Sequence, residues 1–259
     1  MVSKETIKLP GELTVKNIAI LSLGASGTNA LFNELLKNTQ ILNHPFKEPF
    51  HNKLGTLEKR LLHHNREFHQ VIDTLLWSAK RKKLVIHIKP QHLKQANVGI
   101  REFITQYNDS FDFVRIERKN YLARVVSSEF KSLRKTLSPS EFESLGKVRL
   151  QTEKGKILWK MHEIKSKNES IAKPLQSLDH LFFDYEKDIN QERGPETVSN
   201  IICERHGISG SNSRRLVQRE NYHGRKNKWS EIKLEQKIEN FDEVMADFTG
   251  TEYEWMLWE

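Results

Sequence analysis

The residues best suited to chemistry lie in a glycine-rich segment after an apolar run, Ser22-Leu23-Gly24-Ala25-Ser26-Gly27-Thr28-Asn29. Glycines let backbone N–H groups converge on one point, and the N-terminus of a following helix adds partial positive charge. Ser26, Thr28 and Asn29 add side-chain donors. The segment predicts a phosphate-binding turn. A tight strand-to-helix turn capped by Ser or Thr is the alternative.

The same segment lacks what a nucleotide triphosphatase needs. That class requires G-x-x-x-x-G-K-[ST], with a Lys on the transferred phosphate and a hydroxyl on magnesium. No Lys follows Gly27, and the predicted strand ends carry no obvious acidic residue for a metal. None of the 11 His residues has a convincing metal-ligand spacing. The turn therefore favours a metal-free phosphate site over a kinase or ATPase.

A second candidate anchor follows the apolar run Phe111–Ile116. Arg118 comes at the end of this predicted strand, and Ser127 lies nine residues later in the next predicted helix, with Lys119, Arg124 and Ser128 as neighbours. A guanidinium and a hydroxyl so placed can hold one phosphate from two sides. An ordinary basic helix face is the alternative.

The strands and helices that position these residues can be predicted from the sequence, where short apolar runs alternate with longer amphipathic ones. Strands are predicted at 18–23, 84–88, 111–116 and 180–183. Helices are predicted at 30–37, 57–79, 98–107, 121–133, 141–172 (interrupted), 196–206 and 230–248. This alternation predicts an α/β fold with a central, mostly parallel sheet flanked by helices. Ligands of such sheets bind beyond the carboxyl ends of the strands.

Composition limits the class of protein. The 259 residues, 37% of them hydrophobic, predict a single domain over 1–259, with an extension at 1–15 and a basic loop at 209–229. The single cysteine, Cys203, excludes a disulfide framework and a Cys-based zinc site, and it favours the cytoplasm. We expect neither a signal peptide nor a membrane span. The net charge of +8 favours an anionic partner.

Taken together, these segments resemble the PAPS-dependent sulfotransferases, in particular a bacterial and cyanobacterial branch (PAPS is 3′-phosphoadenosine 5′-phosphosulfate). Three segments resemble family motifs in matching order: the turn at 25–29, Arg118-Lys119-Asn120 with Ser127, and Tyr185-Glu186-Lys187-Asp188. The ending EIKLEQKIENFDEVMADFTGTEYEWML resembles the C-terminus of that branch. The resemblance covers residues 18–257 and implies the P-loop-like sulfotransferase fold.

The resemblance also implies ligand contacts. The turn from Gly24 to Asn29 would hold the 5′-phosphosulfate, Arg118 and Ser127 would hold the 3′-phosphate, and the product would be 3′,5′-ADP, with no metal. In one respect the sequence departs from the family, because the usual basic residue before S-G-T is Ala25 here. Lys89, after the second predicted strand, is a candidate substitute.

The base that deprotonates the acceptor is expected in His44-Pro45-Phe46-Lys47-Glu48-Pro49-Phe50. The E-P-F triplet resembles the branch in which a Glu is the proposed base, which assigns Glu48. His92, in a predicted loop beside the same crevice, is the rival catalytic residue. His44, Phe50 and Lys89 are predicted to contact the acceptor.

The basic loop and the acceptor complete the predicted set of ligand contacts. Arg219 and Arg225, in the basic loop, are assigned to the nucleotide by resemblance to the family's C-terminal loop. The acceptor is predicted to be a small molecule, first a hydroxylated specialised metabolite such as an alkaloid toxin, and second a carbohydrate or lipid-linked sugar. We expect no nucleic-acid or membrane partner, and the oligomeric state stays open. A basic nucleic-acid-binding protein and a magnesium-dependent kinase are the alternatives from other classes.

Overall fold

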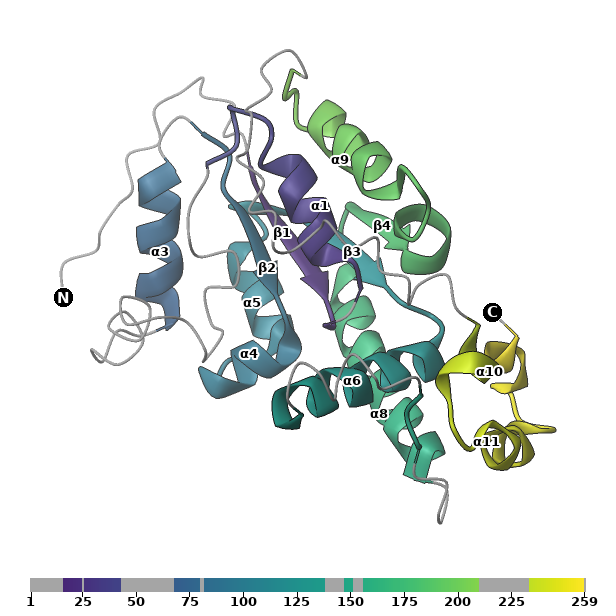
Figure 1. The fold of residues 1–259 in the computed structure, drawn as a ribbon. Helices are drawn as coiled ribbons and strands as arrows, with labels where there is room; N and C mark the ends of the chain where they lie inside the picture. Colours follow the sequence, from purple (N-terminus) through teal and green to yellow (C-terminus); the bar gives the residue numbers. More distant parts are fainter. Residues whose placement is uncertain are drawn as a thin grey trace.

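The computed structural model describes residues 16–24, 26–42, 68–79, 82–137, 147–150, 156–209 and 233–258. Within them four strands form one parallel sheet in the order β2-β1-β3-β4 (Figure 1). The strands are β1 (Asn17–Ser22), β2 (Val85–Ile88), β3 (Phe111–Glu117) and β4 (His180–Asp184). All four strands predicted from apolar runs are present, and the predicted α/β class is confirmed.

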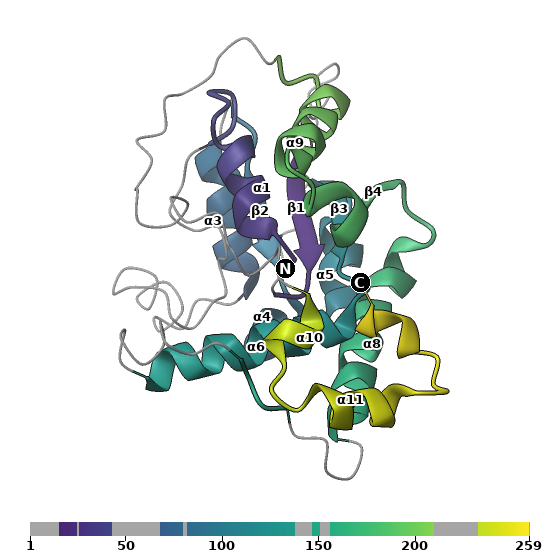
Figure 2. The same cartoon turned by 45° about the vertical axis from the view of Figure 1, so that its right-hand side comes forward.

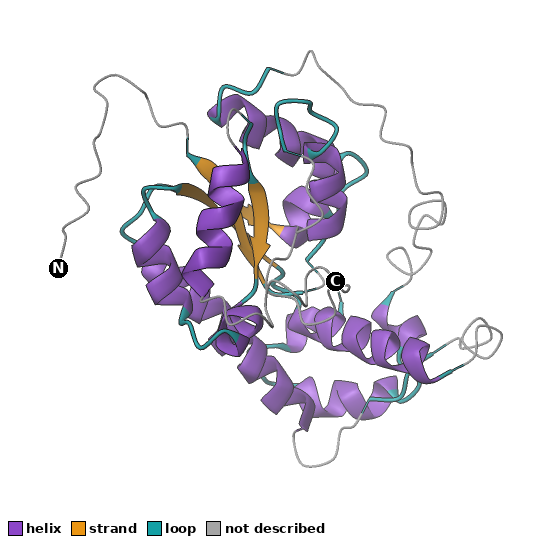
Figure 3. Ribbon diagram, turned by 90° about the vertical axis from the view of Figure 1, so that its left-hand side faces the viewer, coloured by secondary structure: helices purple, strands orange, loops and turns teal. Residues whose placement is uncertain are grey.

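Helices connect and cover the strands. They are α1 (Thr28–Leu35), α3 (Phe68–Ala79), α4 (Pro90–Gln95), α5 (Ile100–Tyr107), α6 (Tyr121–Thr136), α8 (Lys156–Leu175), α9 (Gly194–Arg205), α10 (Leu234–Lys237) and α11 (Phe241–Phe248), with a π-helical turn η2 (Tyr185–Ile189) and a 3-10 turn η3 (Glu254–Leu257). Figure 3 shows the sheet enclosed between helical layers.

The two faces of the sheet pack against different helices because side chains alternate along a strand. Along β1, Ala19 and Leu21 belong to the buried cluster that includes residues of α3, α5 and α8. Ile18 and Ile20 belong to the cluster with α1 and α9. β1 is therefore buried on both faces, as a central strand of a parallel sheet must be.

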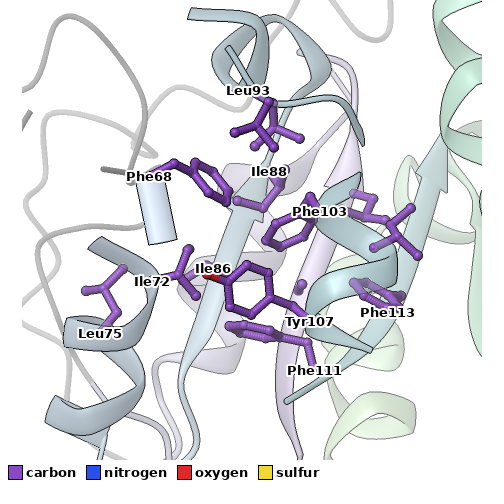
Figure 4. Close-up of a cluster of buried hydrophobic side chains, with 14 of the residues drawn as sticks. Phe68, Ile72, Leu75, Ile86, Ile88, Leu93, Phe103, Tyr107, Phe111 and Phe113 are labelled. Carbon is purple, nitrogen blue, oxygen red and sulfur yellow. The ribbon is translucent and has the colours of Figure 1, made fainter. Parts of the chain in front are cut away.

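Aromatic side chains fill much of the first of these clusters (Figure 4). Phe103 lies with its ring centroid 5.4 Å from Tyr107, 6.0 Å from Phe68 and 6.2 Å from Phe111. Ring pairs at these separations add to the free energy gained by burying their apolar area. This cluster fixes α3 and α5 against the sheet and so holds β1 and β2 in register.

Two predicted segments differ from the structure. Lys89-Pro90-Gln91-His92 is not a loop, because Pro90 begins α4, at the position where proline's missing N–H costs nothing. The helix predicted at 230–248 is broken between α10 and α11, and residues 230–232 lie outside the described part. At the break, the Asn240 amide bonds both the N–H and the carbonyl of Leu150, at 2.9 Å each.

The strand order locates the crevice where ligands bind in such sheets. From β1 the chain moves to β2 on one side, and it then returns past β1 to place β3 on the other side. The connections leaving the carboxyl ends of β1 and β3 therefore run in opposite directions, which opens a crevice between those two ends. The segments that start there are the turn from Leu23 to Gly27 and the segment from Arg118 to Asn120.

Candidate functional site

The described residues of the turn between β1 and α1, Leu23, Gly24, Ser26 and Gly27, are called the cradle turn. It depends on Gly27, the N-cap of α1, which has φ 68° and so lies in the left-handed region that favours glycine. A Cβ on Gly27 would lie 2.5 Å from Ile189 Cγ2 and 3.0 Å from Tyr185 Cε2. The turn is thus packed tightly against η2, and no other residue type fits without displacing those side chains.

The cradle turn is also braced from inside. The Ser26 hydroxyl is buried and lies 2.8 Å from the Leu23 carbonyl and 3.0 Å from Ser22 Oγ, which in turn lies 2.8 Å from Nε2 of the buried His87. The Ser26 side chain, predicted as a ligand donor, therefore points into the protein. Its contribution is to fix the backbone of the turn.

The N-terminus of α1 has no side chain that caps it. The N-cap makes no side-chain hydrogen bond to the helix, and the first turn carries no acidic residue. The first N–H groups of a helix have no partner inside it, and they attract anions. Thr28 is buried and Asn29 is exposed. The backbone N–H groups of these two residues are the donors that the cradle turn can offer to an anion.

Arg118 and Ser127 converge as predicted from their spacing. Arg118 Nη1 lies 3.4 Å from Ser127 Oγ, and the Ser127 hydroxyl donates to the Ala123 carbonyl one turn earlier in α6. The Arg118 guanidinium also stacks over the Tyr185 ring, 4.7 Å from its centroid, and its Nε lies 3.4 Å from a carboxylate oxygen of Glu186. Arg118 is therefore held in place on two sides.

Glu186 fixes the backbone beside Arg118. Its two carboxylate oxygens accept from the N–H groups of Lys119 (3.0 Å) and Asn120 (3.3 Å). Burial raises the pKa of Glu186 against the opposing effects of those hydrogen bonds and of Arg118. The segment 185–188, noted for its resemblance to a family motif, thus orients the strand end that carries Arg118.

Asp184 and Lys119 form a second brace at this point. The Lys119 ammonium lies 2.8 Å from Asp184, whose other oxygen caps η2 by accepting from the Glu186 and Lys187 N–H groups. Burial alone would raise the pKa of Asp184. The hydrogen bond and charge of Lys119, together with the backbone hydrogen bonds from Lys187 and Glu186, outweigh it, so the pKa lies below the ordinary value.

Asn120 ties α6 to the end of the chain. Its side-chain oxygen accepts from the Ala123 N–H at 2.8 Å and so caps α6, while its amide nitrogen donates to the Met256 carbonyl at 3.3 Å. In Figure 2 the C-terminal segment with α10 and α11 lies beside α6. Apolar residues of these C-terminal elements form a third buried cluster with α6 and α8.

Arg124 joins the two candidate anchors. From α6, its Nε donates to the Gly24 carbonyl in the cradle turn at 3.0 Å. Burial, and then the neighbouring Arg118, lower the pKa of Arg124 to about 10. The cradle turn and the Arg118–Ser127 pair therefore face the same crevice, on the same side of the molecule.

Several predicted residues cannot be placed. Ala25, His44, Glu48, Phe50, Arg219 and Arg225 lie outside the described residues, so their assigned roles stay predictions. Lys89 is the N-cap of α4 and is half-buried, and His92 is buried on the same helix. Both follow the carboxyl end of β2, the strand beside β1, and their roles also stay predictions.

The sequence interpretation missed the bracing residues. In the sequence, Arg124 stands out only as a neighbour of Ser127, and His87 is one of 11 His residues with nothing to single it out. The available signal for Arg124 was its spacing, since residues three apart on a helix share a face, as Arg124 and Ser127 do. The sequence carries no comparable signal for the pairing of His87 with Ser22.

The described residues hold neither a cluster of metal ligands nor a membrane-spanning helix. Within that part of the chain, no group of three or more His, Cys, Asp or Glu side chains could hold a metal ion. None of the helices described there is long and apolar enough to cross a bilayer.

Comparison with known proteins adds one structural likeness. No family model matches the chain, and no curated protein matches it. The crystal structure of a sulfotransferase from Alicyclobacillus acidocaldarius matches with a TM-score of 0.47 and 15% identity, over 76% of this chain and 83% of that one.

Proposed function

We propose that the chain is a PAPS-dependent sulfotransferase that transfers the sulfuryl group to a hydroxyl of a small-molecule acceptor. The observation that carries this proposal is the contact between the two anion-binding segments at one crevice. Arg124 Nε, on the helix that carries Ser127, lies 3.0 Å from the Gly24 carbonyl. One nucleotide with anionic groups at both ends can therefore reach both segments.

The residues of the crevice fit such a donor. The cradle turn offers helix N–H groups with no side-chain cap, and a Cβ on Gly27 would disrupt the close packing of that turn. Arg118 offers a guanidinium beside the Ser127 hydroxyl. Charge-assisted hydrogen bonds from such groups are the strong contacts to phosphate and sulfate oxygens. By the resemblance, the cradle turn takes the 5′ end and Arg118 with Ser127 takes the 3′-phosphate.

The donor supplies the reacting group, and the protein contributes its position and the surrounding charge. When bound, the donor supplies an activated sulfuryl group. The protein's residues orient its two ends so that the acceptor oxygen can approach in line, and oriented groups lower the barrier by removing entropic cost. Glu48, assigned as base by resemblance, takes the proton of the acceptor hydroxyl. Cations at the crevice stabilise the charge that develops on the departing phosphate.

The first experiment is calorimetric titration of the purified chain with 3′,5′-ADP. We expect binding that does not require a divalent cation. A chain that binds neither 3′,5′-ADP nor PAPS contradicts the proposal. Salt-dependent binding of DNA or RNA in the same buffer would favour the nucleic-acid-binding alternative instead.

The acceptor is tested separately. We propose a hydroxylated specialised metabolite in the cytoplasm, with a carbohydrate or lipid-linked sugar as the second class. A panel of both classes is incubated with isotopically labelled PAPS, and products are identified by the mass added by one sulfuryl group. Transfer only to the sugars would overturn the first choice and leave the enzyme class in place.

A further inference from the structure

One cation contacts the cradle turn directly, although it lies far from that turn in the sequence. The Arg124 Nε donates to the Gly24 carbonyl at 3.0 Å. This brings a guanidinium to the turn in which Ala25 stands where the resembling family has a basic residue. The positive charge that the turn lacks in sequence is thus supplied in space by α6.

The contact leaves the Arg124 guanidinium incompletely paired. Its Nη1 is buried and has no hydrogen-bond partner among the residues that the structure describes. Buried side-chain donors are almost always paired, so one that is not calls for an explanation such as a ligand. A bound anion near the cradle turn would provide the missing partner.

The charges around Arg124 and Arg118 are of both signs, because Glu163 raises the pKa of Arg124 and a Glu186 oxygen lies 3.4 Å from Arg118 Nε. Arg118 lies close enough to lower the pKa of Arg124. Burial, and then the same Arg118, lower the pKa of Lys237 at the end of α10. Arg124 and Lys237 are each repelled by Arg118, and an entering anion relieves that repulsion. Both the unpaired donor and the like charges therefore indicate an anion at the same place.

We propose that Arg124 is a binding residue for the 5′ end of the nucleotide donor. It supplies the positive charge that the resembling family places at the position of Ala25. This assignment rests on the proposed function. Arg124 bonds the carbonyl of Gly24, which belongs to the cradle turn, and so it serves the end of the nucleotide that the cradle turn holds. Arg118, beside Ser127, serves the other end.

Three substitutions separate the charge of Arg124 from its contact with Gly24. Arg124→Met removes both, Arg124→Gln keeps an N–H donor for the Gly24 carbonyl, and Arg124→Lys keeps the charge. We expect Met and Gln to weaken 3′,5′-ADP binding by about tenfold or more, and Lys to recover part of it. Wild-type affinity in either Met or Gln overturns the proposal. Should the Met variant not fold, the comparison of Gln with Lys decides.

A second nucleotide tells the two ends apart. Arg124→Met should weaken 5′-AMP and 3′,5′-ADP by the same factor, whereas Arg118→Ala should weaken only 3′,5′-ADP. If Arg124→Met weakens only 3′,5′-ADP, the assignment to the 5′ end is wrong. Arg205→Met is the matched control, since Arg205 pairs with Asp179 just before the amino end of β4, whereas the crevice lies at the carboxyl ends of the strands.

Inorganic pyrophosphate makes the test independent of the proposed function. It should raise the melting temperature of the wild type and of Arg205→Met, and it should leave that of Arg124→Met unchanged. If the wild type binds neither nucleotide, the enzyme class fails while this comparison still judges Arg124. Equal shifts in wild type and Arg124→Met, or no shift in the wild type, overturn the role of Arg124 in anion binding.

Discussion

Gly27→Ala tests how tightly the cradle turn is packed against η2. Gly27 has φ +68°, and a residue with a Cβ pays about 1–2 kcal/mol in that conformation. The added Cβ would also lie 2.5 Å from Ile189 Cγ2 and 3.0 Å from Tyr185 Cε2. Overpacking of this kind costs about 1–3 kcal/mol more. We therefore expect the free energy of unfolding to fall by about 2–5 kcal/mol.

Two other glycines separate these contributions. Gly207 has φ +61° with nothing within 4 Å of a built Cβ, so Gly207→Ala reports the backbone strain alone. Gly24 has open space and no positive φ, so Gly24→Ala reports the baseline change from glycine to alanine. The difference between Gly27→Ala and Gly207→Ala then measures the steric clash with η2.

The assay is urea denaturation, supported by thermal melting, where about 2–4 °C accompanies each kcal/mol in a chain of this size. Tyr185 carries the Arg118 guanidinium on its ring, so displacing it should also weaken 3′,5′-ADP binding in Gly27→Ala. Equal destabilisation in Gly27→Ala and Gly207→Ala would refute the close packing. The cradle turn would then be independent of η2.

Three further predictions concern other parts of the molecule. Glu48→Gln should abolish sulfuryl transfer in a labelled-donor assay and spare 3′,5′-ADP affinity, while Arg118→Ala should weaken that affinity by about tenfold to a hundredfold; equal loss of affinity in both would contradict the assigned roles. Burial, and then Lys83, lower the pKa of His206 to about 4, so His206 contributes stability that is complete above its ordinary pKa of 6.5 and is lost as pH falls toward 4. Urea denaturation should show that the free energy of unfolding falls by about 3 kcal/mol more between pH 7 and pH 4 in the wild type than in His206→Gln. The same fall in both proteins would contradict this. Lys119→Met should raise the pKa of Asp184, whose lowered pKa contributes stability above the ordinary carboxyl pKa that is lost on acidification. The variant should therefore be about 1 kcal/mol less stable at pH 7, a small effect because Lys119 is half exposed, and the difference should shrink as pH falls below the ordinary carboxyl pKa, as acid titration followed by circular dichroism would show.

The sequence predicted the parts of the fold that depend on local pattern. Continuous apolar runs identify β1 and β3 because strands buried on both faces carry no polar alternation. The Gly24–Gly27 turn and the closeness of Arg118 and Ser127 could also be predicted, because each depends on residues that are near one another along the chain. The helix break at Asn240 was not, because it depends on hydrogen bonds to Leu150, 90 residues away.

The less predictable part of the site is the set of contacts between distant segments. Ser26 has the composition of a ligand donor, yet its hydroxyl turns inward because Ser22 and the Leu23 carbonyl are nearer partners. Arg124 looked like one more basic residue on a helix surface, and only the adjacency of β1 and β3 brings it to the Gly24 carbonyl. Residue type and spacing therefore located the crevice, while tertiary structure decided which side chains face it.

The bond from Asn120 to Met256 spans 136 residues, and it has a practical consequence for anyone who handles the protein. A proteolytic nick just after Phe248 would remove η3 and its bond to Asn120, the cap of α6, yet it would leave all four described strands of the sheet in place. Such a preparation should keep most of its far-ultraviolet circular dichroism, and under the proposed function we expect it to bind 3′,5′-ADP less tightly. Intact mass at the C-terminus is therefore a better measure of competent protein than secondary-structure content.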